Sequence, residues 1–108
     1  MRQYEIWWAD LPPPVGRRPV LLLTRSAAYV YLNKVIVVEI TTNIREIPQE
    51  VPMGEPEGLV PSVANFDNIH VVAKHLLSFR VGALAPARER EVKRALGYAL
   101  GWAELKTL

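Results

Sequence analysis

Residues 34–42 read KVIVVEITT, and this segment decides the fold. Val35 to Val38 is a continuous run of β-branched residues with no polar side chain in it. Such a run is typical of a strand that is covered on both faces, because a strand with one wet face alternates apolar and polar residues. We therefore expect a central strand over residues 34–42, with the other elements arranged around it.

Several further segments on both sides of this strand also have strand character. Residues 4–9 are aromatic and β-branched, and residues 20–24 are apolar or β-branched after Pro19, which can occupy the first position of a strand. The connection between them reads DLPPPVG, and its three consecutive prolines predict a stiff loop. After an excursion over residues 26–33 and the central strand, we expect shorter strands over residues 50–53, 63–72 and 76–81.

The last segment changes to a helical period. Pro86 suits the first turn of a helix, and apolar residues then recur every three or four positions. They are Val92, Ala95, Leu96, Ala99, Leu100 and Ala103. We interpret Gly97 and Gly101, which lower helix propensity, as points of close packing against the sheet. Short strands followed by one C-terminal helix predict a single α+β or small-barrel domain over residues 1–108.

The composition excludes several classes of function. The 108 residues include no cysteine, which removes disulfides, thiolate nucleophiles and thiolate metal sites. No apolar run is long enough to span a membrane and the N-terminus lacks a secretory signal, so we expect a cytoplasmic protein. There is no Gly-rich phosphate loop and no metal-ligand motif, and we expect neither a metal nor another cofactor. The net charge is only +2, so a basic binding site would have to be formed by Lys and Arg residues that cluster locally.

Polar residues gather where the predicted strands begin or end. In a small barrel such ends converge, and a phosphodiester site needs this chemistry: a guanidinium fork for the phosphate charge and a hydroxyl for one oxygen. Taken singly, each residue is more often structural, as a solvated strand edge, a turn former or an exposed histidine. The residues concerned are Arg17, Arg18, Thr41, Thr42, Asn43, Ser62, Asn65, Asp67 and His70.

The combination of segments resembles a known family. EIWWADLPP (5–13), RRPVLLLT (17–24), VIVVEITTNIR (35–45), LVPSVANFDNI (59–69) and LLSFRVGALAPARERE (76–91) with VKRALGYALG (92–101) occur in this order over nearly the whole chain. Together they resemble the MazF/PemK (also called Kid) toxin endoribonucleases of type II toxin–antitoxin systems. The resemblance implies a small, curved SH3-like β-barrel of the CcdB/PemK-like type with a C-terminal helix, assembled as a homodimer.

The same resemblance implies an activity and a partner. Family members are sequence-specific mRNA interferases that cleave single-stranded RNA without a metal, by attack of the 2′-hydroxyl, and leave a cyclic phosphate. An acidic antitoxin protein is expected to block the RNA groove. The family motifs place catalytic roles on Arg18, Thr41 and Asp67, and RNA-binding roles on Arg17, Thr42, Asn43, Arg45, Asn65, His70 and Lys74.

Two departures from the family pattern leave alternatives open. Asn65 and His70 stand where arginines occur in other members, so a second basic group could be absent, could be His70, or could be supplied by Arg45 or Lys74. The same fold also hosts the CcdB-type gyrase poison, a protein-binding inhibitor without catalysis that depends on a tryptophan near its C-terminus. Trp102 is near the end here, but the match is loose, and Arg18 with Thr41 favours the ribonuclease.

Overall fold

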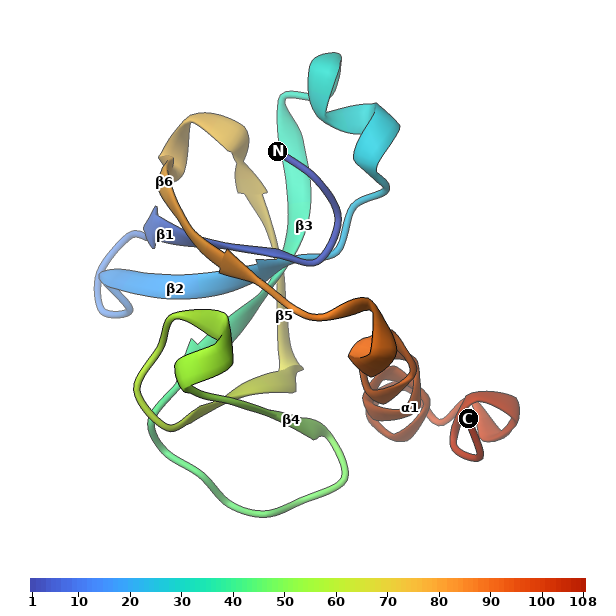
Figure 1. Ribbon diagram of the computed structural model, residues 1–108. Coiled ribbons are helices and arrows are strands. Elements are labelled where there is room, and N and C mark those ends of the chain that lie inside the picture. The colour runs from blue at the N-terminus through green and yellow to red at the C-terminus, as the bar shows by residue number, and fades with distance from the viewer.

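A computed structural model of residues 1–108 shows a curled, six-stranded antiparallel sheet with one C-terminal helix (Figure 1). The strands follow the order β4-β5-β3-β2-β1-β6, and α1 lies beside β4 and β5 at one end of the sheet. The predicted α+β fold is confirmed. The elements are β1 (Glu5–Asp10), β2 (Arg17–Leu22), β3 (Lys34–Thr41), β4 (Glu50–Met53), β5 (Ser62–Ala73), β6 (Leu77–Ala83) and α1 (Glu89–Leu100).

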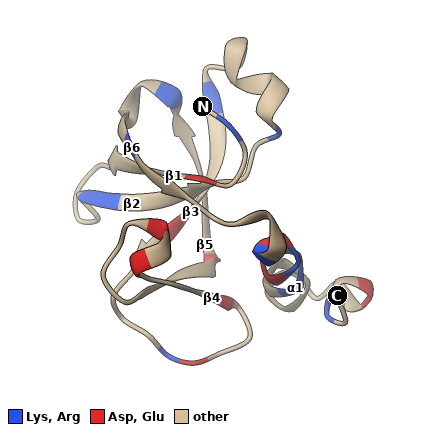
Figure 2. Cartoon of the chain, in the orientation of Figure 1, with Lys and Arg blue, Asp and Glu red and all other residues tan.

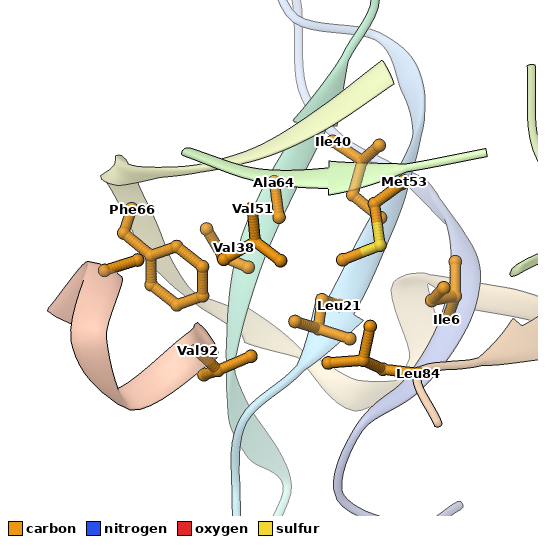
Figure 3. Close-up of a cluster of buried hydrophobic side chains, with 11 residues drawn as sticks. Ile6, Leu21, Val38, Ile40, Val51, Met53, Ala64, Phe66, Leu84 and Val92 are labelled. Atoms are coloured by element: carbon orange, nitrogen blue, oxygen red, sulfur yellow. The ribbon is translucent and has the colours of Figure 1, made fainter. Parts of the chain in front are cut away.

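The central strand β3 is covered on both faces, as its β-branched run predicts. Val38 and Ile40 point into a larger cluster of buried side chains, which Val92 of α1 helps to close (Figure 3). Val35 and Val37 point the other way, into a second cluster. Because successive side chains of a strand alternate between faces, one apolar run serves two cores. Each fully buried side chain of this size contributes roughly 1.5–3 kcal/mol to folding.

The second strand lies earlier in the chain than the sequence predicts. We expected a strand over residues 20–24, but β2 begins at Arg17, which pairs with Asp10, while Arg18 pairs with Ala9. Because β1 pairs with this strand from Arg17 to Leu21, the two arginines are part of the sheet. The excursion at 26–33 contains a short 3₁₀ helix over Ser26–Val30.

The interpretation of the two helix glycines is wrong. A Cβ on Gly97 would lie 2.8 Å from Leu105 Cβ, so the close approach is to the C-terminal segment and not to the sheet. Gly101 adopts φ +73° and caps the helix, which explains why α1 ends at Leu100 while Ala103 lies in a separate turn. No helix has the length and apolar character needed to cross a membrane.

The segment between β4 and β5 folds back over β6. Its 3₁₀ turn, Glu55–Glu57, approaches β6 so closely that a Cβ on Gly82 would lie 2.3 Å from the Glu57 carbonyl oxygen. Arg88, just before α1, fixes this turn from the side. Its guanidinium pairs with the Glu57 carboxylate at 3.3 Å and donates to the Pro52 carbonyl at 2.6 Å. The turn is thereby held against the sheet, and the residues that follow it, Gly58 to Val60, form one wall of the site described below.

Candidate active site

A cavity of about 420 Å³ opens between the start of β2, the end of β3 and the 58–62 segment. Figure 2 shows basic residues at the start of β2 and acidic residues on the turn that precedes this segment. The cavity brings together Arg18 and Thr41, and also Arg17 and Thr42, as the sequence predicts for converging strand ends. Its lining residues are Trp8, Arg17, Arg18, Pro19, Ile40, Thr41, Thr42, Gly58, Leu59, Val60 and Ser62.

Strand register explains why Arg18 and Thr41 meet. β2 and β3 are antiparallel, with Val20 paired to Glu39 and Leu22 paired to Val37. The same register, continued by two residues, places Arg18 opposite Thr41. Because residues two apart on a strand share a face, both side chains project to the same side of the sheet as Glu39. A guanidinium and a hydroxyl are therefore held side by side on two rigid strands.

A buried carboxylate, which is not among the site residues predicted from the sequence, lies beside Arg18. Glu39 is 7% exposed, and its carboxylate oxygen Oε1 lies 3.3 Å from Arg18 Nη1. Its other oxygen contacts Nε2 of His70, on the neighbouring strand β5. A buried charge is tolerated only when it is paired, and here Glu39 has two partners. The one signal in the sequence is the single charge that interrupts the apolar segment VIVVEIT, because a doubly covered strand requires a partner for it.

Arg17 projects to the opposite face from Arg18, since adjacent residues on a strand alternate. Its guanidinium carbon lies 5.2 Å from the ring centroid of Trp8 and 5.2 Å from that of Phe79. The two rings are themselves 6.4 Å apart. These cation–π contacts hold the guanidinium at the rim of the cavity, where it adds positive charge next to exposed aromatic surface.

The remaining polar residues near the end of β3 have local partners. Thr41 Oγ1 accepts a hydrogen bond of 3.1 Å from the Asn43 amide, so its hydroxyl hydrogen remains free to donate. On β5, Asn65 is buried and its Oδ1 accepts a 2.9 Å hydrogen bond from the Asp67 amide. Asp67 is exposed and lies where the pairing of β5 with β3 shifts register. Neither Asn65 nor Asp67 lines the cavity.

The structure separates the candidates for a second basic group. Lys74 donates through Nζ to the Tyr29 carbonyl at 2.6 Å, beyond the far end of β5. Arg45 lies on the connection between β3 and β4 and does not line the cavity. His70 does not line the cavity either, but it is joined through Glu39 to Arg18, which does. Of the three candidates, His70 is the one that the fold links to the Arg18 site.

Comparison with known proteins gives one consistent family. Residues 2–100 match the family model described as PemK-like, MazF-like toxin of type II toxin-antitoxin systems. The chain is 38% identical over 103 residues to "Probable endoribonuclease MazF2" of Mycobacterium tuberculosis, covering 94% of this chain and 99% of that protein.

Two solved structures are similar over most of the chain. The Mycobacterium tuberculosis toxin MazF-mt6 superposes with a TM-score of 0.85 at 35% identity, covering 90% of this chain and 96% of that one. An endoribonuclease in complex with its cognate antitoxin, from a mycobacterial species, gives a TM-score of 0.83 at 31% identity, covering 94% and 96%. Sequence and structure therefore point to the same relatives.

Proposed function

The chain belongs to the PemK-like, MazF-like toxins of type II toxin–antitoxin systems, and we propose that it cleaves single-stranded RNA at the cavity between β2 and β3. The observation that carries the proposal is the pairing of Arg18 with Thr41 at the wall of this cavity. Relatives named endoribonuclease support RNA cleavage over the CcdB-type alternative. Trp102, on which that alternative rests, lies in the segment between α1 and the last turn, outside the cavity.

Cleavage of a phosphodiester requires stabilisation of the negative charge on the phosphate oxygens, and the Arg18 guanidinium can supply it. One of its terminal nitrogens is directed to Glu39, which leaves other N–H groups of the planar guanidinium for two phosphate oxygens. Thr41 donates its free hydroxyl hydrogen to one of these oxygens. In the proposed reaction the neighbouring 2′-hydroxyl attacks phosphorus and the 5′-oxygen leaves, so the products are a cyclic phosphate and a 5′-hydroxyl end.

The rim of the cavity is suited to single-stranded RNA. Arg17 supplies a second positive charge, and Trp8 and Phe79 supply aromatic faces on which a base can stack. Phe79 is 48% exposed. Sequence-tolerant stacking combined with phosphate contacts is the usual way in which proteins hold single strands.

We further propose that the chain works in the cytoplasm as a homodimer controlled by an acidic antitoxin protein. A similar solved structure is described as an endoribonuclease in complex with its cognate antitoxin. An acidic segment that folds on binding would pair with Arg17 and Arg18 and cover the cavity. Its affinity is expected to fall as salt rises, and sedimentation at micromolar concentration is expected to show a dimer.

The direct experiment is cleavage of a long unstructured RNA by the purified protein in EDTA, with chemical identification of both new ends. We expect cyclic phosphate and 5′-hydroxyl ends at a short recurring sequence. An oligonucleotide with a single 2′-deoxy sugar before the scissile phosphate serves as the matched substrate and is expected to resist cleavage. Cutting of the deoxy substrate, or inhibition of gyrase without RNA cleavage, would contradict the proposal.

A further inference from the structure

A histidine–carboxylate pair adjoins the Arg18 site, and neither the family motifs nor the polar strand ends assign a role to its carboxylate, Glu39. Glu39 is a single carboxylate shared by Arg18 and His70. We propose that His70 is the general base that takes the proton from the attacking 2′-hydroxyl, and that Glu39 is the positioning residue that holds it in the required form. This inference rests on the proposed ribonuclease function and names a further catalytic group for it.

Strand pairing places the three side chains on one face. Val20 of β2 pairs with Glu39 of β3, and Val37 of β3 pairs with His70 of β5. Arg18, two residues before Val20, therefore shares a face with Glu39 and His70. Because Arg18 and His70 contact the two oxygens of one carboxylate, the guanidinium proposed to hold the phosphodiester and the imidazole proposed as the base are separated by Glu39 alone.

The hydrogen-bond chemistry selects the reactive nitrogen. An ionised carboxylate can only accept, so Nε2 of His70 must carry the hydrogen that Glu39 receives. In the neutral imidazole the other nitrogen, Nδ1, then has a free lone pair. The His70 side chain is 41% exposed, and Nδ1 makes no hydrogen bond within the chain, so it is open to a substrate. A carboxylate that fixes the histidine tautomer in this way is the arrangement found in hydrolytic triads.

The proposed step balances as follows. Nδ1 of His70 accepts the proton of the 2′-hydroxyl while the 2′-oxygen forms its bond to phosphorus. The bond from phosphorus to the 5′-oxygen breaks, and the electron pair stays on the 5′-oxygen, which takes a proton from water. The imidazolium, stabilised by Glu39, returns its proton to the solvent. The charged group in contact with His70 is Glu39 from β3, and Glu39 in turn contacts Arg18 from β2.

Two variants separate this role from a structural one. His70→Ala removes the base and is expected to slow single-turnover cleavage by about 10²-fold to 10⁴-fold. Added imidazole should restore part of the rate, because it can occupy the space of the lost ring. Glu39→Gln can still accept from Arg18 through its carbonyl, but its amide donates to Nε2 of His70. The hydrogen then moves to Nδ1, and the base is lost although the ring is present.

The chain contains a matched control. His75 is the second of the two histidines, and it is exposed in the short turn Lys74–Leu76. His75→Ala is expected to cleave at the parental rate and to keep the parental pH profile. Folding of every variant is checked by circular dichroism, and His70→Gln replaces His70→Ala if the alanine variant does not fold.

The test is the single-turnover rate on a defined RNA oligonucleotide from pH 5 to pH 8. We expect the cleavage rate of the parent to decrease as the pH is lowered, as protonation of a histidine base predicts. We expect this decrease at acid pH to be absent from both His70→Ala and Glu39→Gln. A folded His70 variant that cuts at the parental rate, or that is slow but still loses rate at acid pH as the parent does, would overturn the inference. If Arg18→Ala is inactive in the same assay while His70→Ala is not, the ribonuclease proposal stands and only the inference fails. A parent that cuts no RNA refutes both.

Discussion

Replacing Gly82 by alanine is expected to destabilise the protein and to deform the active cavity. The new Cβ would lie 2.3 Å from the Glu57 carbonyl oxygen, whereas ordinary contacts begin at 3.4 Å, so the turn must retreat by roughly 1 Å. The turn cannot retreat freely, because the Glu57 carboxylate is held by Arg88 at 3.3 Å and accepts from the Gly54 amide at 2.7 Å. Overpacking of this kind costs about 1–3 kcal/mol. In a domain of this size, each kcal/mol lowers the melting temperature by about 4–8 °C.

Thermal and urea unfolding of Gly82→Ala, compared with Gly54→Ala, measure this effect. A Cβ on Gly54 meets no atom within 4 Å, and its φ of −171° is open to any residue, so this variant should unfold like the parent. RNA cleavage by Gly82→Ala should also fall, because the displaced turn leads into Gly58, Leu59 and Val60 of the cavity wall. A Gly82→Ala protein with parental melting temperature and cleavage rate would show that the contact is not tight.

Three further outcomes are expected. Arg88→Ala should lose roughly 1–3 kcal/mol of unfolding free energy at pH 7. The hydrogen bond from Arg88 lowers the pKa of Glu91, and this effect outweighs the opposing effect of burial. The stabilisation from this pair is therefore present above the ordinary Glu pKa of about 4.3 and is lost as the pH falls through the lowered pKa of Glu91 in the folded protein. The difference between the urea midpoints of parent and variant should therefore shrink below about pH 4, while the part that rests on the Pro52 carbonyl remains. Thr41→Ala should slow cleavage by up to about tenfold, as loss of one neutral hydrogen bond predicts, and Thr41→Ser should retain most of the rate. Arg17→Ala should weaken RNA binding and reduce the salt slope by about 0.7, whereas Lys93→Ala on the exposed side of α1 should change neither.

The order of the elements and part of the site could be predicted from the sequence. The apolar run of β3 marks a doubly covered strand, and Pro86 marks the start of the helical segment, because these signals are local. The polar strand ends gave a larger set of candidates that includes Arg18 and Thr41, and the resemblance to the family singled out these two as catalytic. That they meet in one cavity follows from the β2–β3 register.

Other features depend on contacts between distant segments. Glu39 lies within an apolar strand, and its role appears only when β2 and β5 bring Arg18 and His70 to the same carboxylate. Gly97 could not be assigned a partner from helical spacing, because the segment that packs on it follows the helix and folds back. Lys74 resembles a groove cation in the sequence, but the structure places its ammonium group on the Tyr29 carbonyl.

Single-turnover cleavage by Arg18 variants tests the central claim most directly. Arg18→Lys keeps a positive charge for Glu39 but lacks the planar fork, so the variant separates phosphate geometry from pairing with the buried carboxylate. Loss of one preorganised donor of this kind costs about 10²-fold to 10³-fold in rate, or roughly 3–4 kcal/mol. We predict that Arg18→Ala cleaves at the background rate and that Arg18→Lys recovers little of the parental rate in EDTA. Cleavage by a folded Arg18→Ala protein at the parental rate would contradict the account.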